Sequence, residues 1–172
     1  MREVNLLSQS LHHPKTLNDI NTRLAEAGQP PITQADFIRI EDRELFQQLR
    51  RRANSPLFVS IDELCDSLES PLLERVQHLR SLPPTPEPEL DRLADKLVLS
   101  IIDIRIEKTK QLSARIKDLV VEAEISGEVE SYNEYKSQLV ELTRQLWTIQ
   151  QAKNAMSAVS KRRAEEASLD RF

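Results

Sequence analysis

The chain has 172 residues, with 24 basic and 28 acidic side chains and a formal net charge of -4. This length suits one domain or two small ones, and the acidic balance argues against wholesale binding to a nucleic-acid backbone. Gly28 and Gly127 are the only two glycines. Because strand hairpins and phosphate-binding loops need glycine, the composition disfavours sheet-rich folds and glycine-rich nucleotide sites. It predicts an all-α protein.

Cysteine usage and hydropathy bear on the location of the protein. Cys65 is the single cysteine, so the chain cannot form an internal disulfide or a cysteine zinc cluster. The longest apolar run, 97–102, contains Ser100 and is far shorter than the roughly 20 residues that cross a bilayer. No secretory hydrophobic segment opens the chain. We therefore expect a cytoplasmic protein with no membrane partner.

The first half of the chain is predicted to form short helices. Apolar residues at helical spacing, broken before Pro14, indicate a first helix near 4–13. A second ends at Gly28, since glycine commonly closes helices in the left-handed conformation. A third follows a turn at 33–37 and ends in three arginines at 50–52, which we interpret as a solvated helix end.

Local cap signals mark two further short helices. Ser60 and Glu63 have the spacing of a capping box. Ser70 is followed by Pro71, which is typical of an N-cap with proline at the first helical position. Prolines within 83–88 then predict a stiff, extended connector. The five short helices need a shared core, so we expect a compact bundle.

The second half is predicted to be an antiparallel helical hairpin. All nine prolines lie at or before Pro88, and the rest of the chain holds a single glycine, Gly127. Inside a helix, proline costs about 3 kcal/mol and glycine about 1 kcal/mol relative to alanine. We therefore expect a long helix over about 89–126, a turn at 127–131 and a return helix.

The apolar pattern of these helices divides the chain. Before Lys108 the first long helix has two apolar stripes, which predicts burial on two sides. After it a single stripe continues through Leu112, Ile116, Leu119 and Ala123. The return helix has heptad spacing from Tyr132 to Met156, behind a second capping box at Ser131 and Glu134. We expect a bundle over 1–105 and a hairpin over 106–172, bridged by the long helix.

The hairpin segregates its charges. Six carboxylates and no basic residue lie between Lys117 and Lys136, whereas 136–163 has six basic residues against Glu141 alone. Trp147 lies off the heptad stripe, with Arg144 as a helical neighbour. An exposed tryptophan beside an arginine is typical of an interface anchor. The alternative is that Trp147 packs against the first long helix or the bundle. The basic residues at 161–163 are interpreted as a polar end that frays.

The residues give little support for catalysis. His12 and His13 are adjacent and point to different faces of a helix, and His78 is distant in sequence, so no histidine pair has metal-ligand spacing. No obvious base accompanies Cys65 as a nucleophile. We expect no catalytic residue, no metal site and no cofactor.

The order of these features resembles the C-terminal helicase-interaction domain of bacterial, DnaG-type DNA primases. The matching pieces are LLSQSLHHP at 6–14, ADF at 35–37 before ELF at 44–46, LVLSIIDIR at 97–105, and EAE at 122–124 before GE at 127–128. Tyr135, Leu139, Leu142 and Leu146 complete the series. The resemblance covers nearly the whole chain, while the primase catalytic core and zinc module have no counterpart here.

This resemblance implies a bundle that continues through a long helix into a hairpin. It also implies that the hairpin docks onto the N-terminal domains of the hexameric replicative DNA helicase, that the bundle modulates the helicase, and that priming is thereby coupled to unwinding. Direct contact with nucleic acid is not expected, and the isolated chain is expected to be a monomer.

A helix-in-groove mode of docking would use the outer face of the return helix. The candidate contact residues are Tyr132, Tyr135, Val140, Arg144, Trp147, Gln150 and Gln151. The two tyrosines are alternatively part of the hairpin core. A flexible junction is expected near 105–109, where burial on two sides stops.

Three other classes of function remain open, the last of them an uncharacterised enzyme, for which the sequence offers no constellation of residues. In a self-associating coiled-coil adaptor, the apolar stripes would pair between chains, although a glycine turn favours the internal hairpin. A nucleic-acid-binding module would use the basic runs 50–52 and 161–163, but the acidic balance disfavours it.

Overall fold

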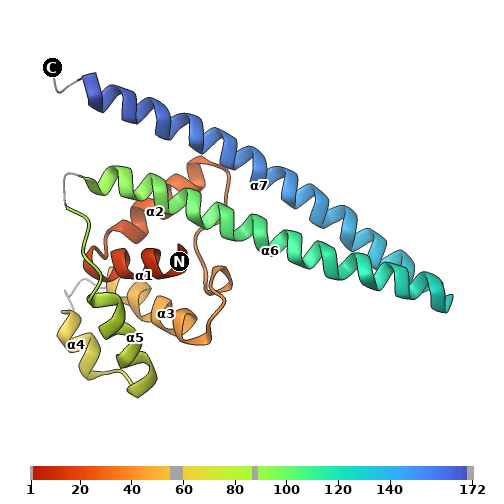
Figure 1. Ribbon diagram of the computed structural model, residues 1–172, viewed down its shortest axis with the longest axis horizontal. Coiled ribbons are helices and arrows are strands. Elements are labelled where there is room, and N and C mark those ends of the chain that lie inside the picture. Colours follow the sequence, from red (N-terminus) through yellow and green to blue (C-terminus); the bar gives the residue numbers. More distant parts are fainter. Residues whose placement is uncertain (1, 55–59, 87–88, 170–172) are drawn as a thin grey trace.

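The computed structural model describes residues 2–54, 60–86 and 89–169, and within them it is all-α. The elements are α1 (Arg2–His12), α2 (Thr16–Glu26), the 3-10 turn η1 (Gln34–Asp36), α3 (Ile40–Asn54), α4 (Ile61–Asp66), α5 (Ser70–Arg80), α6 (Leu90–Ser126) and α7 (Val129–Leu169). Helices α1 to α5 form a bundle beside the first half of α6, and α6 and α7 form an antiparallel hairpin whose turn projects away from it (Figure 1). The predicted fold class is confirmed.

Several helix ends follow the predicted local rules. Gly28 and Gly127 both have positive φ, 67° and 75°, and Gly127 is the C-cap of α6. Residues that have a Cβ atom are strained at positive φ, whereas glycine is not. Each of the two glycines therefore allows the backbone to leave the helix in the left-handed conformation. The capping box at Ser60 is also present, because Glu63 N donates to the Ser60 hydroxyl at 3.1 Å and Ser60 N donates to Glu63 at 2.7 Å.

Two predicted caps differ from the structure. Helix α5 has Glu69 as its N-cap, one residue before the predicted Ser70. The capping box at Ser131 and Glu134 is wrong, because α7 already begins at Val129 and the Ser131 hydroxyl donates to the Glu128 carboxylate at 3.1 Å. The turn of the hairpin is therefore shorter than 127–131, since Glu128 N bonds back to Ala123 O and α7 starts at the next residue.

The core lies between the bundle and the first half of α6. Leu97, Val98, Ile101 and Ile102 are completely buried, which confirms the two-stripe prediction for this part of α6. The bundle contributes apolar side chains from α1, α2, α3 and α5, and the Phe37 and Phe46 rings meet with centroids 5.0 Å apart. This half of α6 is therefore packed on one side against the bundle and on another against α7.

Helix α7 returns along α6 as far as the bundle. Ala152 and Met156 belong to the same apolar core, and Lys153 Nζ lies 2.7 Å from Asp103 Oδ1. Arg163 does not fray into solvent, contrary to our interpretation of 161–163, because its Nη1 donates to the buried Asp95 carboxylate at 2.8 Å. The end of α7 is thus bound to the beginning of α6.

Asp95 joins three helices. Besides Arg163 of α7 it accepts hydrogen bonds from Arg23 of α2, whose guanidinium also bonds Asp91. Burial by itself lowers the pKa of Arg23, but the hydrogen bonds to Asp95 and Asp91 outweigh it and the pKa is raised. The Arg23 side chain therefore stays charged in the fold and pairs a carboxylate that would be costly to bury alone.

One arginine of the run at 50–52 is not solvated. Arg50 and Arg51 are exposed, as predicted for a helix end, but Arg52 is buried and donates from Nη1 to Leu11 O at 3.1 Å. Burial lowers its pKa. The interpretation of the whole run as a solvated helix end is therefore wrong at Arg52, which ties α3 to the end of α1.

Beyond Thr109, α6 contacts α7 alone. Ile116 and Ala123 are buried in the seam, as predicted. Leu112 was expected in the same stripe but is exposed, because it lies one turn beyond Lys108 on the side that faces the bundle, and the bundle ends at that height. No helix in the described part of the chain is both long and apolar enough to cross a membrane.

Candidate functional site

The outward face of α7 carries exposed apolar side chains. Val140 and Trp147 are 62% and 65% exposed, and they lie seven residues apart on one helical face with Arg144 between them. The opposite face of α7 supplies the hairpin seam, where Leu142 is buried. Trp147 therefore does not pack against α6 or the bundle, which resolves the alternative left open by the sequence.

Five of the seven candidate contact residues lie open to solvent. Val140, Arg144, Trp147, Gln150 and Gln151 are all exposed. The Gln150 amide makes one long hydrogen bond, 3.5 Å, to Asn154 Oδ1. These side chains are free of the core and form a continuous outer stripe of α7, which we call the outer face.

The two tyrosines differ from the other candidates. Tyr132 and Tyr135 are half-buried, as expected for side chains shared between the hairpin seam and the surface. Lys136 Nζ lies 4.7 Å from the centroid of the Tyr132 ring, and its hydrogen bond and charge interaction with Tyr132 raise the pKa of Lys136. This contact holds the Tyr132 ring against its own helix, so Tyr132 contributes less free surface than Trp147.

Arg144 is held only by an exposed ion pair. Its Nη1 donates to Glu141 Oε2 at 3.0 Å, and both side chains are largely exposed. Ion pairs three or four residues apart on a helix surface contribute about 0.2 to 0.5 kcal/mol, so the guanidinium can exchange Glu141 for a partner's carboxylate at small cost. The hydroxyls of Thr143 and Thr148 are already bonded to backbone carbonyls of α7.

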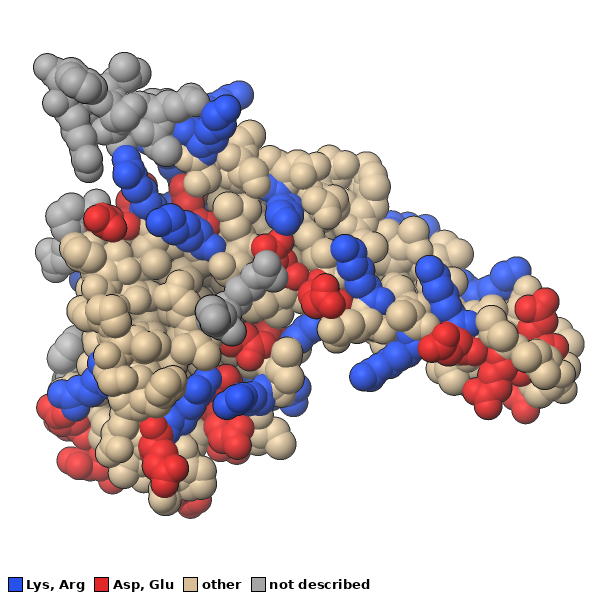
Figure 2. Space-filling model, viewed as in Figure 1, with Lys and Arg blue, Asp and Glu red and all other residues tan. Residues whose placement is uncertain are grey.

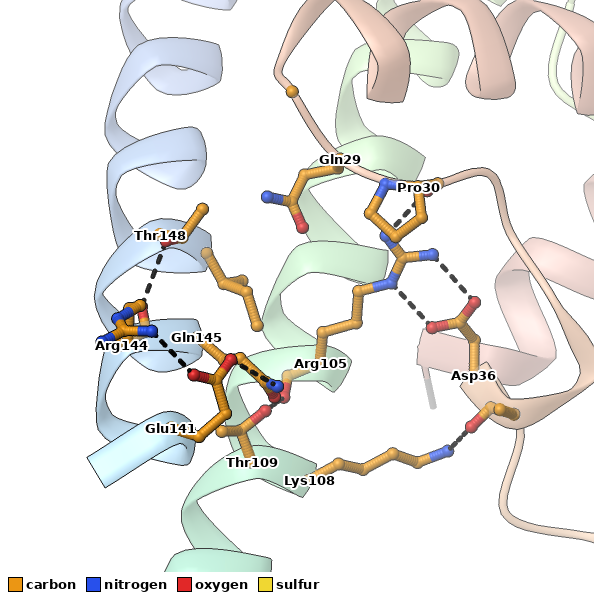
Figure 3. A pocket seen from close by; sticks show the side chains of 13 residues that line it. Gln29, Pro30, Asp36, Arg105, Lys108, Thr109, Glu141, Arg144, Gln145 and Thr148 are labelled. Carbon is orange, nitrogen blue, oxygen red and sulfur yellow. Dashed lines mark hydrogen bonds and ion pairs between the residues drawn. The ribbon is translucent and has the colours of Figure 1, made fainter. Parts of the chain in front are cut away.

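A crevice of about 420 Å³ separates the hairpin from the bundle (Figure 3). Its bundle wall is the segment around Pro30 and Asp36, its floor is α6, and its other wall is α7 with Arg144 and Gln145. Arg105 of α6 spans the crevice floor to Asp36, with Nε and Nη2 donating at 2.8 and 3.0 Å. This bidentate pair fixes the height at which α6 leaves the bundle.

Two cationic side chains of the crevice floor, Arg105 and Lys108, are bonded to the bundle wall. Arg105 also donates to the carbonyls of Pro30 and Pro31, and Lys108 Nζ donates to Ala35 O. Burial lowers the pKa of Lys108, while nearby Glu3 and Asp36 act in the opposite direction. Arg105 and Lys108 therefore brace the junction at 105–109 against the bundle.

The histidine and cysteine side chains considered for chemistry have the following surroundings. His13 lies 3.0 Å from Thr85 O, which occupies its Nε2. Cys65 is a half-buried free thiol. Among the residues described, no three histidine, cysteine, aspartate or glutamate side chains come together as a metal site would require.

The free end of the hairpin carries apolar residues that the sequence interpretation missed. Val121, Ile125 and Val129 are exposed around the turn at Gly127. Carboxylates gather at this end of the molecule (Figure 2). A signal was present in the sequence, because Val121 and Ile125 lie off the predicted seam stripe within an acidic segment, where nothing calls for large apolar side chains.

Comparison with known proteins gives no relative. No protein-family model, no curated protein and no solved structure matches the chain.

Proposed function

We propose that this chain is a non-catalytic docking domain and that the outer face of α7 is its binding surface. The observation that carries the proposal is the exposure of Trp147, since large aromatic side chains at the centre of an exposed face act as binding anchors. The bundle holds the hairpin in position through two sets of ion pairs. The first is the pair of Arg105 with Asp36, which we call the Arg105 brace, and the second joins Asp95 to Arg23 and Arg163.

The partner that we propose is the hexameric replicative DNA helicase, through its N-terminal domains. The support is the resemblance of the ordered sequence motifs to the helicase-interaction domain of bacterial primases. A bundle with a projecting hairpin agrees with the architecture that this resemblance implies. In this role the chain couples primer synthesis to unwinding and modulates helicase activity without performing chemistry itself, and its location is the cytoplasm.

The mode of docking follows from the geometry of the outer face. Val140, Arg144, Trp147 and Gln151 recur at helical spacing, which is the arrangement of anchors that an amphipathic helix lays into a groove. Trp147 and Val140 supply the apolar contact, and Arg144 supplies a charged hydrogen-bond donor for a carboxylate on the groove rim.

A self-associating adaptor is the alternative, because two outer faces bearing Val140 and Trp147 could also meet each other. The heptad stripes themselves are used inside one chain, in the seam of α6 and α7, so they do not supply this association. Sedimentation velocity across a range of concentrations separates the two proposals, since a monomer at tens of micromolar excludes the adaptor.

Replacement of Trp147 by alanine tests the docking surface. We expect Trp147→Ala to weaken binding to the helicase hexamer by about 1 to 3 kcal/mol, with helicity unchanged because the side chain lies outside the core. Isothermal titration calorimetry suits the measurement, because Trp147 is the one tryptophan of the chain and its loss removes the intrinsic fluorescence probe.

Val159→Ala is the matched control, since Val159 is another exposed apolar residue of α7 on a different helical face. Unchanged affinity of Trp147→Ala removes Trp147 from the site. Failure of the wild-type chain to bind at tens of micromolar removes the helicase as the partner.

A further inference from the structure

The free end of the hairpin has a surface of its own. Val121 and Ile125 are one turn apart on α6 and are 53% and 82% exposed. They border a hollow of about 440 Å³ together with Asp118, Glu122 and Ser126. We call these five residues the tip patch.

The fold does not account for the apolar members of the tip patch. The seam of α6 and α7 at this height is supplied by Ala123, which is buried, and the turn is supplied by Gly127. Val129 is likewise exposed in the first turn of α7, beside a second hollow of about 300 Å³ that includes Tyr132. Contiguous apolar side chains with a polar border, in hollows on a projecting element, are typical of an interaction site.

Carboxylates outnumber basic side chains around the tip patch, where Lys117 and Lys136 border the acidic segment. Between Lys117 and Lys136 all charged side chains are carboxylates: Asp118, Glu122, Glu124, Glu128, Glu130 and Glu134. Ion pairs of the described residues involve none of these carboxylates. Figure 2 shows acidic side chains gathered at the free end of the hairpin, with basic side chains beside them farther along it. The field at the tip therefore attracts cationic groups.

This charge excludes several occupants of the tip patch. A nucleic-acid backbone and an anionic membrane surface are both repelled by clustered carboxylates. The tip of a second copy carries the same charges and is repelled as well. An occupant that satisfies both the apolar side chains and the carboxylates is a protein surface that combines apolar side chains with lysines and arginines.

We propose that the tip patch binds an amphipathic helix of a partner protein, one whose apolar face is bordered by lysine and arginine side chains. Val121 and Ile125 contact the apolar face in the hollow, while Asp118 and Glu122 pair with the basic side chains. At 1.5 Å per residue along α7 the first residue of α7, Val129, is roughly 16 Å from Val140 and roughly 27 Å from Trp147. The tip patch lies on α6 and the outer face on α7, so the two surfaces share no residue. The proposal does not depend on the helicase.

The experiment uses the full chain and two labelled helical peptides of about 18 residues, a length sufficient for helix formation when bound. Both have leucine on one face. The first has lysine and the second glutamate on the remaining positions. We expect fluorescence anisotropy to give binding of the lysine peptide that weakens as salt rises, and binding of the glutamate peptide that is at least about tenfold weaker.

Two matched double variants assign the binding to the tip patch. Val121→Ser with Ile125→Ser removes its apolar side chains, and Ile38→Ser with Ile40→Ser removes two exposed isoleucines from the bundle. We expect about a tenfold loss of lysine-peptide affinity in the tip variant and none in the bundle variant. Circular dichroism checks that both retain their helices. No binding of the lysine peptide, equal binding of both peptides, or equal effects of the two variants overturns the proposal.

Discussion

The two halves of α6 have different surroundings, although they belong to one continuous helix. The first half lies between the bundle and the end of α7, with Leu97, Val98, Ile101 and Ile102 completely buried. The second half has α7 as its one neighbour, and its buried seam contains Ile116 and Ala123. Arg105 and Lys108 mark the change, where they bond the segment 30–36 between α2 and α3.

This difference places the candidate binding surfaces on the less buried half of the molecule. Val121, Ile125, Val140 and Trp147 all lie beyond the Arg105 brace in the hairpin. A two-helix element exposes more of its surface than a helix enclosed on two sides, and it has a lower local free energy of opening. The hairpin presents side chains to a partner, while the bundle supplies the stability that holds the hairpin in position.

Substitution of one buried isoleucine in each half of α6 compares how tightly the two halves are packed. We expect Ile101→Ala to lower the free energy of unfolding by about 4 kcal/mol, because Ile101 is fully enclosed, and Ile116→Ala to lower it by about 2 kcal/mol, because its surroundings can relax toward solvent. Urea denaturation followed by circular dichroism measures both. Equal losses would show that the seam of the hairpin is packed as tightly as the core, and the distinction between the halves would fail.

The link between α7 and the bundle is tested at Asp95. We expect Asp95→Asn to lower the free energy of unfolding by about 3 kcal/mol, because it leaves Arg23 without the charge of its buried partner and weakens the bond to Arg163. Asp91→Asn is the control, because Asp91 pairs with Arg23 but is largely exposed, and we expect a loss below about 1 kcal/mol. Equal losses in the two variants would mean that Asp95 does not hold the three helices together.

Much of the fold could be predicted because its signals are local. Gly28 and Gly127 end helices at a positive φ, and the capping box at Ser60 depends on residues three apart. The same type of signal failed at Ser131, where a matching spacing occurs inside a helix that had already begun. A short motif gives the presence of a helix end more reliably than its exact residue.

Interactions between distant segments could not be predicted in this way. Arg163 and Asp95 are 68 residues apart in sequence, and Arg52 bonds a carbonyl 41 residues away. Each arginine belongs to a basic run that is ordinarily solvated, and only the tertiary arrangement brings a buried acceptor to it. The tip patch was missed for another reason, since the acidic segment was interpreted by its charge and the large apolar residues within it were not considered.

Hydrogen exchange of the native protein tests the central distinction most directly. We expect amides of α6 within 97–105 to exchange with protection close to the global free energy of unfolding, and amides within 110–126, together with those of 129–148 in α7, to exchange by local opening at a lower free energy. The protection of the amides against exchange should decrease in the helical turns of α6 that follow Arg105. Uniform protection along the whole of α6 would contradict the account.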